Sequence, residues 1–493
     1  MKHLLEDAKR LVRLNSTAKH GNEELANLIH GMLQDRGIKS QLQLVTHSLE
    51  DVSKRQFNVI GVLGDPLVDR KIRKGLLLLS HLDTFPAGLS ENWTETGGDP
   101  FALTVKDGKV FGLGTASAKL DFLCKLRVME KFREKKLKMP IYLVGTCGRE
   151  VGMLGSRYLI KSLSLNPKYV IVGEPTDNRI IHAHKSQLIY RVSIGFHQVE
   201  RDSKGFNRRI DLHSFGRSVC GSSPEKGVNA IDQMLDFLGR GIQNGFEFRF
   251  TTVEGGESPS QVPDRALGEF YMTTQQFENF KRFFRESIRM AGKEKAFRVE
   301  LGGLGDSGIR FIPDSVFRAV LEVQSFFKKT AEVLATRHDP SFDPGISTVN
   351  LSRIEPFTSA IQMTFDVRLL PAQVQSEVLA QIEAGVQQIA SKYPSLNIRG
   401  TLDKKVSSLS LPSESQWVQI CQESLKGAEI PPVMSKKSTA SEAALFQEAG
   451  YDAVSFGPGS SQSVAGSPNE HGLLTQIEKA VAFYSELIER TCL

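Results

Sequence analysis

The chain has 493 residues, of which 40% are hydrophobic and 24% charged, and its formal net charge is +6. This length is too great for one ordinary domain, so we expect two or three domains with sizeable cores. No run approaches the ~18 apolar residues of a membrane helix, and no basic stripe is interleaved with aromatic residues, so we expect neither a membrane nor a nucleic-acid partner. Five scattered cysteines and the lack of a signal-peptide pattern predict a cytoplasmic protein.

Short apolar runs alternate with helical patterns in the first third of the chain. The predicted strands are 57–63, 75–82, 141–146 and 169–173, and the predicted helices are 3–14, 23–36, 119–132 and 154–162. Strands separated by helices indicate an α/β fold with a mainly parallel sheet and helices on both faces. The pattern returns near the end, with helices near 415–425 and 440–448, a strand at 453–456 and a final amphipathic helix.

The middle of the chain differs and contains an internal repeat. Two units, about 227–302 and about 314–401, each have the order helix, strand, strand, helix, strand. An offset of about 95 residues is far too long for a solenoid, so we interpret the repeat as a duplicated ferredoxin-like subdomain; a shared element order arising by chance is the alternative. The prediction is a discontinuous α/β domain, 1–185 and 402–493, with an inserted α+β domain at 186–401.

Polar residues follow three of the predicted strands. His81 and Asp83 come at the end of the second strand, Arg149 and Glu150 follow the third, and Glu174 follows the fourth. Ligands of α/β sheets bind at the carboxyl ends of the strands, so we expect these side chains to meet there.

These residues stand in motifs that resemble a known family. His81-Leu-Asp83, Gly112-Leu-Gly-Thr-Ala-Ser117-Ala-Lys, Thr-Cys-Gly-Arg149-Glu150, Gly-Glu174-Pro and Gly466-Ser-Pro-Asn-Glu resemble the zinc family of acetylornithine deacetylases, succinyl-diaminopimelate desuccinylases, aminoacylases and related dipeptidases. The resemblance implies a fold of the zinc-exopeptidase type, in which the inserted domain is a lid. Some dipeptidase relatives carry a doubled lid that imitates a partner subunit, so we expect a monomer.

The resemblance also assigns a role to each position of the site. One zinc of the family binds the His of the first motif, a bridging Asp and the Glu of Gly-Glu-Pro; the other binds the bridging Asp, the second Glu of a Glu-Glu pair and a His near the C-terminus. His81, Glu150 and Glu174 therefore remain as ligands, with Asp83 behind them. Ser117 replaces the bridging Asp and Gly466 replaces the C-terminal His. Catalytic zinc normally has three protein ligands, so we expect no cofactor, or at most one weakly bound zinc.

Arg149 stands where the family has its general base, the first Glu of the pair. A guanidinium stays protonated and cannot accept a proton from water, and its charge repels a metal ion. We predict that Arg149 pairs with one or more of Asp83, Glu150 and Glu174, which would otherwise be crowded carboxylates without a counter-charge. A surface position for Arg149 is the alternative.

In the lid, Cys220 occupies the place of a His that the family uses as an electrophile, and a thiol cannot supply that hydrogen bond. His213 as a substitute, Cys220 as a nucleophile and Cys220 as a plain small residue remain open. Arg368 and Asn229 are candidate ligand-binding residues, because an Arg on a strand suits a carboxylate. The alternative is that Arg368 pairs with Asp366 or Glu355. Likewise, His471 is either a rescued zinc ligand or a surface or capping residue.

Three hypotheses for the function follow. The first is a non-catalytic homologue, a pseudo-hydrolase that binds an amino-acid-like or peptide ligand. The second is a hydrolase of N-acyl amino acids or dipeptides with an altered, single-metal site. The third is a partner-binding scaffold that uses the large surface of the doubled lid.

Overall fold

The structure is a computed structural model that describes residues 1–68, 71–116, 119–162, 165–197, 205–290, 296–304, 309–460 and 466–493. The chain divides into two compact units, Met1–His184 with Leu409–Leu493, and Lys185–Ser408. The second boundary lies beyond residue 402, because the last strand of the inserted unit continues to Val406. In the described part of the chain, no helix combines the length and apolar character needed to cross a membrane.

The first unit is built on one mixed sheet. Its strands lie in the order β1 (Lys39–Val45), β2 (Gln56–Leu63), β8 (Ile141–Thr146), β5 (Gly75–His81), β9 (Pro167–Gly173), β21 (Asp452–Phe456), β10 (Ile180–His184) and β19 (Leu409–Ser410), with β20 (Met434–Lys437) also paired to β10. The four central strands, β8, β5, β9 and β21, are parallel, whereas β1 and β2 and the pairs of β10 with β21 and β19 are antiparallel. The predicted parallel sheet is therefore its central part.

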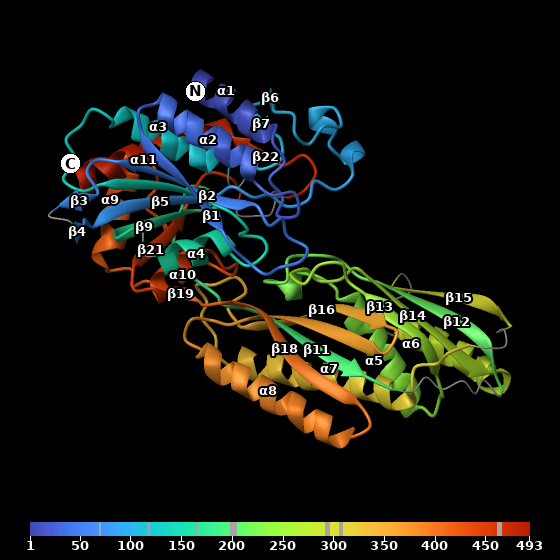
Figure 1. Ribbon diagram of the computed structural model, residues 1–493. Coiled ribbons are helices and arrows are strands. Elements are labelled where there is room, and N and C mark those ends of the chain that lie inside the picture. The colour runs from blue at the N-terminus through green and yellow to red at the C-terminus, as the bar shows by residue number, and fades with distance from the viewer. Residues whose placement is uncertain are drawn as a thin grey trace. The chain divides into compact units, whose positions relative to one another are not determined.

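Helices cover both faces of this sheet, as predicted (Figure 1). The main core lies under α1 (Lys2–Val12), α2 (Glu23–Asp35), α3 (Lys119–Lys131), α9 (Gln416–Gly427) and α11 (Leu474–Cys492). The other face carries α4 (Leu154–Ser162) and α10 (Ala443–Glu448). Every residue of β5 and β8 is buried, which explains their unbroken apolar sequences. Small sheets are formed by β6 (Thr104–Lys106), β7 (Lys109–Phe111) and β22 (His471–Leu473), and by β3 (Leu67–Val68) and β4 (Lys71–Ile72).

The second unit is one continuous sheet made of two similar halves. The strand order is β15 (Phe297–Leu304), β12 (Phe206–Phe215), β14 (Arg265–Thr273), β13 (Arg249–Gly255), β16 (Thr348–Phe357), β17 (Ala360–Arg368), β11 (Gln187–Gly195) and β18 (Asn397–Val406). One half runs β12, α5 (Ala230–Gln243), β13, β14, α6 (Thr274–Met290), β15. The other runs β11, α7 (Asp314–Ala335), β16, β17, α8 (Gln375–Lys392), β18. Both halves have the βαββαβ order of a ferredoxin-like unit, which agrees with the predicted internal repeat.

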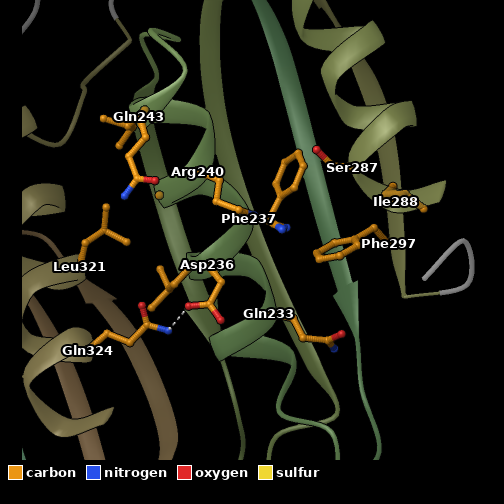
Figure 2. Close-up of a pocket in the computed structure, with 13 residues that line it drawn as sticks. Gln233, Asp236, Phe237, Arg240, Gln243, Ser287, Ile288, Phe297, Leu321 and Gln324 are labelled. Atoms are coloured by element: carbon orange, nitrogen blue, oxygen red, sulfur yellow. Dashed lines mark hydrogen bonds between the residues drawn. The ribbon is translucent and has the colours of Figure 1, made fainter. Parts of the chain in front are cut away.

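The predicted repeat missed the first strand of each half. The half that begins with β12 is inserted between β11 and α7 of the other half, so β11 is far in sequence from its own partners. The two halves meet where β13 pairs with β16 at Gly255 and Ile354. On the helical side, Gln324 of α7 donates to Asp232 and Asp236 of α5 at 2.7 and 3.2 Å. Figure 2 shows the hydrogen bond between Gln324 and Asp236 beside a groove of about 600 Å³ along α5.

Candidate functional site

Three neighbouring parallel strands position the candidate site at their carboxyl ends. β5 ends at His81 and lies between β8, which ends at Thr146, and β9, which ends at Gly173. His81 and Asp83, Arg149 and Glu150, and Glu174 follow from these three ends. The strand order thus brings together the residues that the sequence placed at one edge of the sheet.

The guanidinium of Arg149 is held by two of the remaining acids. Nε lies 3.0 Å from Oε1 of Glu174, Nη2 lies 2.8 and 3.0 Å from Oε1 and Oε2 of Glu174, and Nη1 lies 2.7 Å from Oε1 of Glu150. The side chain of Arg149 is 17% exposed and that of Glu174 is 3% exposed. The predicted pairing of Arg149 is therefore confirmed, and the surface alternative is wrong.

Asp83 fixes the loop that carries Arg149. Its two carboxylate oxygens accept hydrogen bonds from the backbone N–H groups of Arg149 and Glu150, at 3.1 and 3.0 Å. Nδ1 of His81 lies 3.0 Å from the carbonyl oxygen of Asp83 and 3.5 Å from Oδ1. Burial alone would raise the pKa of the Asp83 carboxyl, but the hydrogen bonds from His81 and from the two amides lower it. Asp83 is thus a buried anion that positions its neighbours.

Neighbouring opposite charges keep the buried side chains of the site in their charged forms. Burial opposes the charged forms of Glu174 and Arg149, yet the pKa of Glu174 is lowered by Arg149, Lys437 and His81. The pKa of Arg149 is raised by Glu150 and Glu174. Burial also opposes the charged form of His81, but its hydrogen bond to Asp83 raises its pKa. The pair of Arg149 and Glu174 is therefore ionised at neutral pH.

This arrangement does not fit a catalytic zinc. The oxygens of Glu174 and one oxygen of Glu150 already accept hydrogen bonds from a permanent cation. Within the described ranges, no group of three or more His, Cys, Asp or Glu side chains has a geometry that could hold a metal ion. Ser117, at the bridging position, lies outside the described residues.

Glu442 is a further buried acid of this region that the sequence analysis did not single out. It directly precedes α10, and its Oε1 accepts from Ser156 at 2.7 Å and from Thr146 at 3.1 Å. Its Oε2 is buried without a hydrogen-bond partner among the described residues. Burial raises the pKa of the Glu442 carboxyl, against the influence of His81 and Arg149. Nothing in the sequence around Glu442 indicates that it lies in this buried region, because a Glu before a short helix is common at the surface.

Gly466 lies in a turn that is fixed to the loop before α3. Its N–H donates to Oε2 of Glu470 at 3.0 Å, and the N–H of Ala116 donates to Oε1 of the same carboxylate at 2.9 Å. His471 follows in β22, where its Nδ1 lies 3.0 Å from the carbonyl oxygen of Asn469 and its ring packs against Phe111. This supports the structural alternative for His471.

The candidate residues of the lid lie in the second unit and are used there in packing. Nε and Nη2 of Arg368 donate to Oδ1 and Oδ2 of Asp366 at 2.8 and 2.9 Å, and both side chains are buried. A guanidinium engaged through two parallel bonds supports the structural pair that was the alternative to ligand binding. Glu355 instead pairs with Arg353.

Asn229 and Cys220 also have structural contacts. Oδ1 of Asn229 caps α5 by accepting from Asp232 N–H at 3.0 Å, and its Nδ2 donates to Asn350 and to the carbonyl of Leu351. The sulfur of half-buried Cys220 accepts from the Ser222 hydroxyl at 3.2 Å, which is neither a base nor a cation. His213 lies on β12, 3.9 Å from Glu300. These contacts favour a plain small residue at Cys220.

Sequence comparison assigns the family. The profile of peptidase family M20/M25/M40 matches residues 77–490, so the chain belongs to this family. Among curated proteins, it is 32% identical to an acetylornithine deacetylase of Photorhabdus laumondii over 241 residues, 48% of this chain and 52% of that protein. It is 33% identical to that of Proteus mirabilis over 217 residues, 44% of this chain and 47% of that protein. These matches span about half the length of the relatives.

Solved structures share the fold over almost the whole chain. An aminoacylhistidine dipeptidase from Vibrio alginolyticus matches with a TM-score of 0.66 at 16% identity, covering 99% of this chain and 96% of that one. A metallo-carboxypeptidase from Sulfolobus solfataricus matches with a TM-score of 0.60 at 18% identity, covering 99% of both chains. The predicted zinc-exopeptidase fold with an inserted lid is confirmed.

Proposed function

We propose that this member of the M20 family is a non-catalytic homologue, a pseudo-hydrolase that binds an amino-acid-like or peptide ligand. The observation that carries the proposal is the position of Arg149, whose guanidinium forms ion pairs with Glu174 and Glu150. Hydrolysis needs a base that accepts a proton from water, and Arg149 cannot do so. The same residue places a fixed positive charge where a metal ion would have to bind.

The proposal includes the expectation that zinc is absent or weakly held. The test is to assay purified protein, after dialysis with zinc, against N-acyl amino acids and dipeptides, with an acetylornithine deacetylase as positive control. We expect no turnover above the uncatalysed rate. Metal-dependent turnover that is lost in His81→Ala would overturn the proposal.

A metal-dependent hydrolase with an altered site is the second candidate. One observation favours it: Glu442 keeps a buried oxygen without a described partner near His81, Arg149 and Asp83. Buried polar groups without partners are rare and call for an explanation, such as a water or an ion. The enzymatic names of the curated relatives also agree with this reading. Zinc retained by the wild type and lost in Glu442→Gln would favour this candidate.

We also propose that the chain is a monomer. The edge strands β13 and β16 of the two halves already pair with each other inside one chain. That pairing leaves neither strand free to extend a sheet with a second copy. Size-exclusion chromatography with light scattering tests this, and a mass of twice 54.6 kDa would contradict it.

A further inference from the structure

The turn at Gly466 has no room for a side chain. The backbone φ of Gly466 is +73°, in the left-handed region that non-glycine residues rarely adopt. A Cβ atom placed there would lie 2.5 Å from Cδ2 of Phe85 and 2.8 Å from its Cβ and Cγ. These separations are far below the 3.5–4.0 Å of favourable carbon contacts. Phe85 therefore fills the space that a side chain at position 466 would need.

Side-chain rotation cannot relieve this contact completely. Cδ2 and Cγ of Phe85 could swing toward solvent, because the residue is 42% exposed. Its Cβ, at 2.8 Å, moves only with the backbone. That backbone follows Asp83, which is bonded to two amides, and Thr84, whose N–H donates to the carbonyl of Ser16 at 3.4 Å. The close approach is thus a property of the loop.

The facing turn is held just as firmly. Glu470 is 1% exposed, and its carboxylate accepts from Gly466 and Ala116. Its carbonyl oxygen accepts from the N–H of Gly112 at 3.0 Å and from the hydroxyl of Thr115 at 3.2 Å. A shift of the turn away from Phe85 would break several of these bonds.

We propose that Phe85 is a plug that occupies the place of the second-metal His, so that this metal position is closed and not merely short of a ligand. The inference rests on the proposed function, because it starts from the loss of the metal centre. It adds that the missing ligands cannot restore two-metal binding on their own. Phe85 must also be removed.

The test restores the lost ligands with and without the plug. One variant carries Ser117→Asp, Arg149→Glu and Gly466→His, and a second adds Phe85→Gly. The readout is zinc atoms per chain, measured by mass spectrometry after loading and dialysis. We expect at most one zinc in the first variant and two in the second. Leu89→Gly in place of Phe85→Gly is the matched control, since Leu89 is exposed in the same segment and is not among the atoms nearest position 466.

Two zincs with Phe85 in place would overturn the inference, and so would fewer than two once Phe85 is removed. If the multiple variants do not fold, a double-mutant cycle in the wild type gives the answer. Gly466→Ala should lower the unfolding midpoint, and the loss should shrink in the Phe85→Gly background. Equal losses in both backgrounds would rule out the plug. The proposed function is tested separately, by the hydrolysis assay on the wild type, so its failure can be told apart from failure of this inference.

Discussion

The guanidinium of Arg149 reaches both carboxylate oxygens of Glu174, with Nη2 2.8 Å from Oε1 and 3.0 Å from Oε2. One residue thus neutralises the acid to which the resemblance of the motifs assigned zinc binding. Glu174 is almost fully buried and Arg149 is 17% exposed, so each partner depends on the other for its counter-charge. Removing one partner from such a pair leaves an uncompensated charge, whereas replacing both is often tolerated.

Arg149→Met is expected to lower the free energy of unfolding by roughly 3 kcal/mol, because Glu174 and Glu150 lose their counter-charge. Zinc should recover part of this loss, since the freed carboxylates can bind a cation. The measurement is urea unfolding with and without zinc. Arg133→Met is the matched control, because Arg133 pairs with Glu134 at the surface, and it should change stability little. An Arg149→Met variant that is as stable as the wild type, and whose stability zinc does not change, would contradict this account.

Acid should weaken the protein through Glu174. Its pKa in the folded protein lies below the ordinary 4.5, so its stabilising contribution is complete above pH 4.5 and is lost as the pH falls through the lowered value. Glu174→Gln removes this contribution. The stability difference between wild type and Glu174→Gln should therefore be constant from pH 7 to about 5 and should shrink in more acidic solution. A difference that grows as the pH falls would have the wrong sign.

Lys119 should act in the opposite pH range. It is fully buried, and burial lowers its pKa from 10.5 to about 7 although Glu470 favours its charged form. Between these values the unfolded chain binds the proton more readily than the folded one, so wild-type stability should rise with pH. Lys119→Met should flatten this rise, at the cost of the hydrogen bond to the Leu14 carbonyl. Unfolding midpoints at pH 7, 8 and 9 measure the slopes, and equal slopes would contradict the prediction.

Arg368 and Asp366 should behave as a structural pair in the second unit. Arg368→Ala is expected to lower the free energy of unfolding by about 3 kcal/mol, because the buried Asp366 loses its counter-charge. Combining Arg368→Met with Asp366→Leu should cost less than either single change. A double-mutant cycle measures the coupling. Independent, additive effects would reopen the reading of Arg368 as a ligand-binding residue.

The sequence predicted the site where local patterns determine it. Apolar runs ending in polar residues identified the strand ends, and the charge of Arg149 among acids predicted its pairing. The sequence analysis did not predict Glu442, because only the fold brings the start of α10 to Thr146 and Ser156. The close approach of Phe85 to Gly466 was not predicted for a similar reason, since the two residues are far apart in the chain. The first strands of the two lid halves were missed because one half interrupts the other.

That interruption has a consequence for how the chain is made. The half from β12 to β15 is continuous in sequence, so it can close its own sheet as soon as it leaves the ribosome. β11 is synthesised before it, yet Leu188 pairs with Val367 and Lys405, which emerge much later. β11 must therefore remain an open strand throughout synthesis of the inserted half. We therefore expect the outer half to be completed later than the inserted one, with its apolar first strand exposed to aggregation in the meantime.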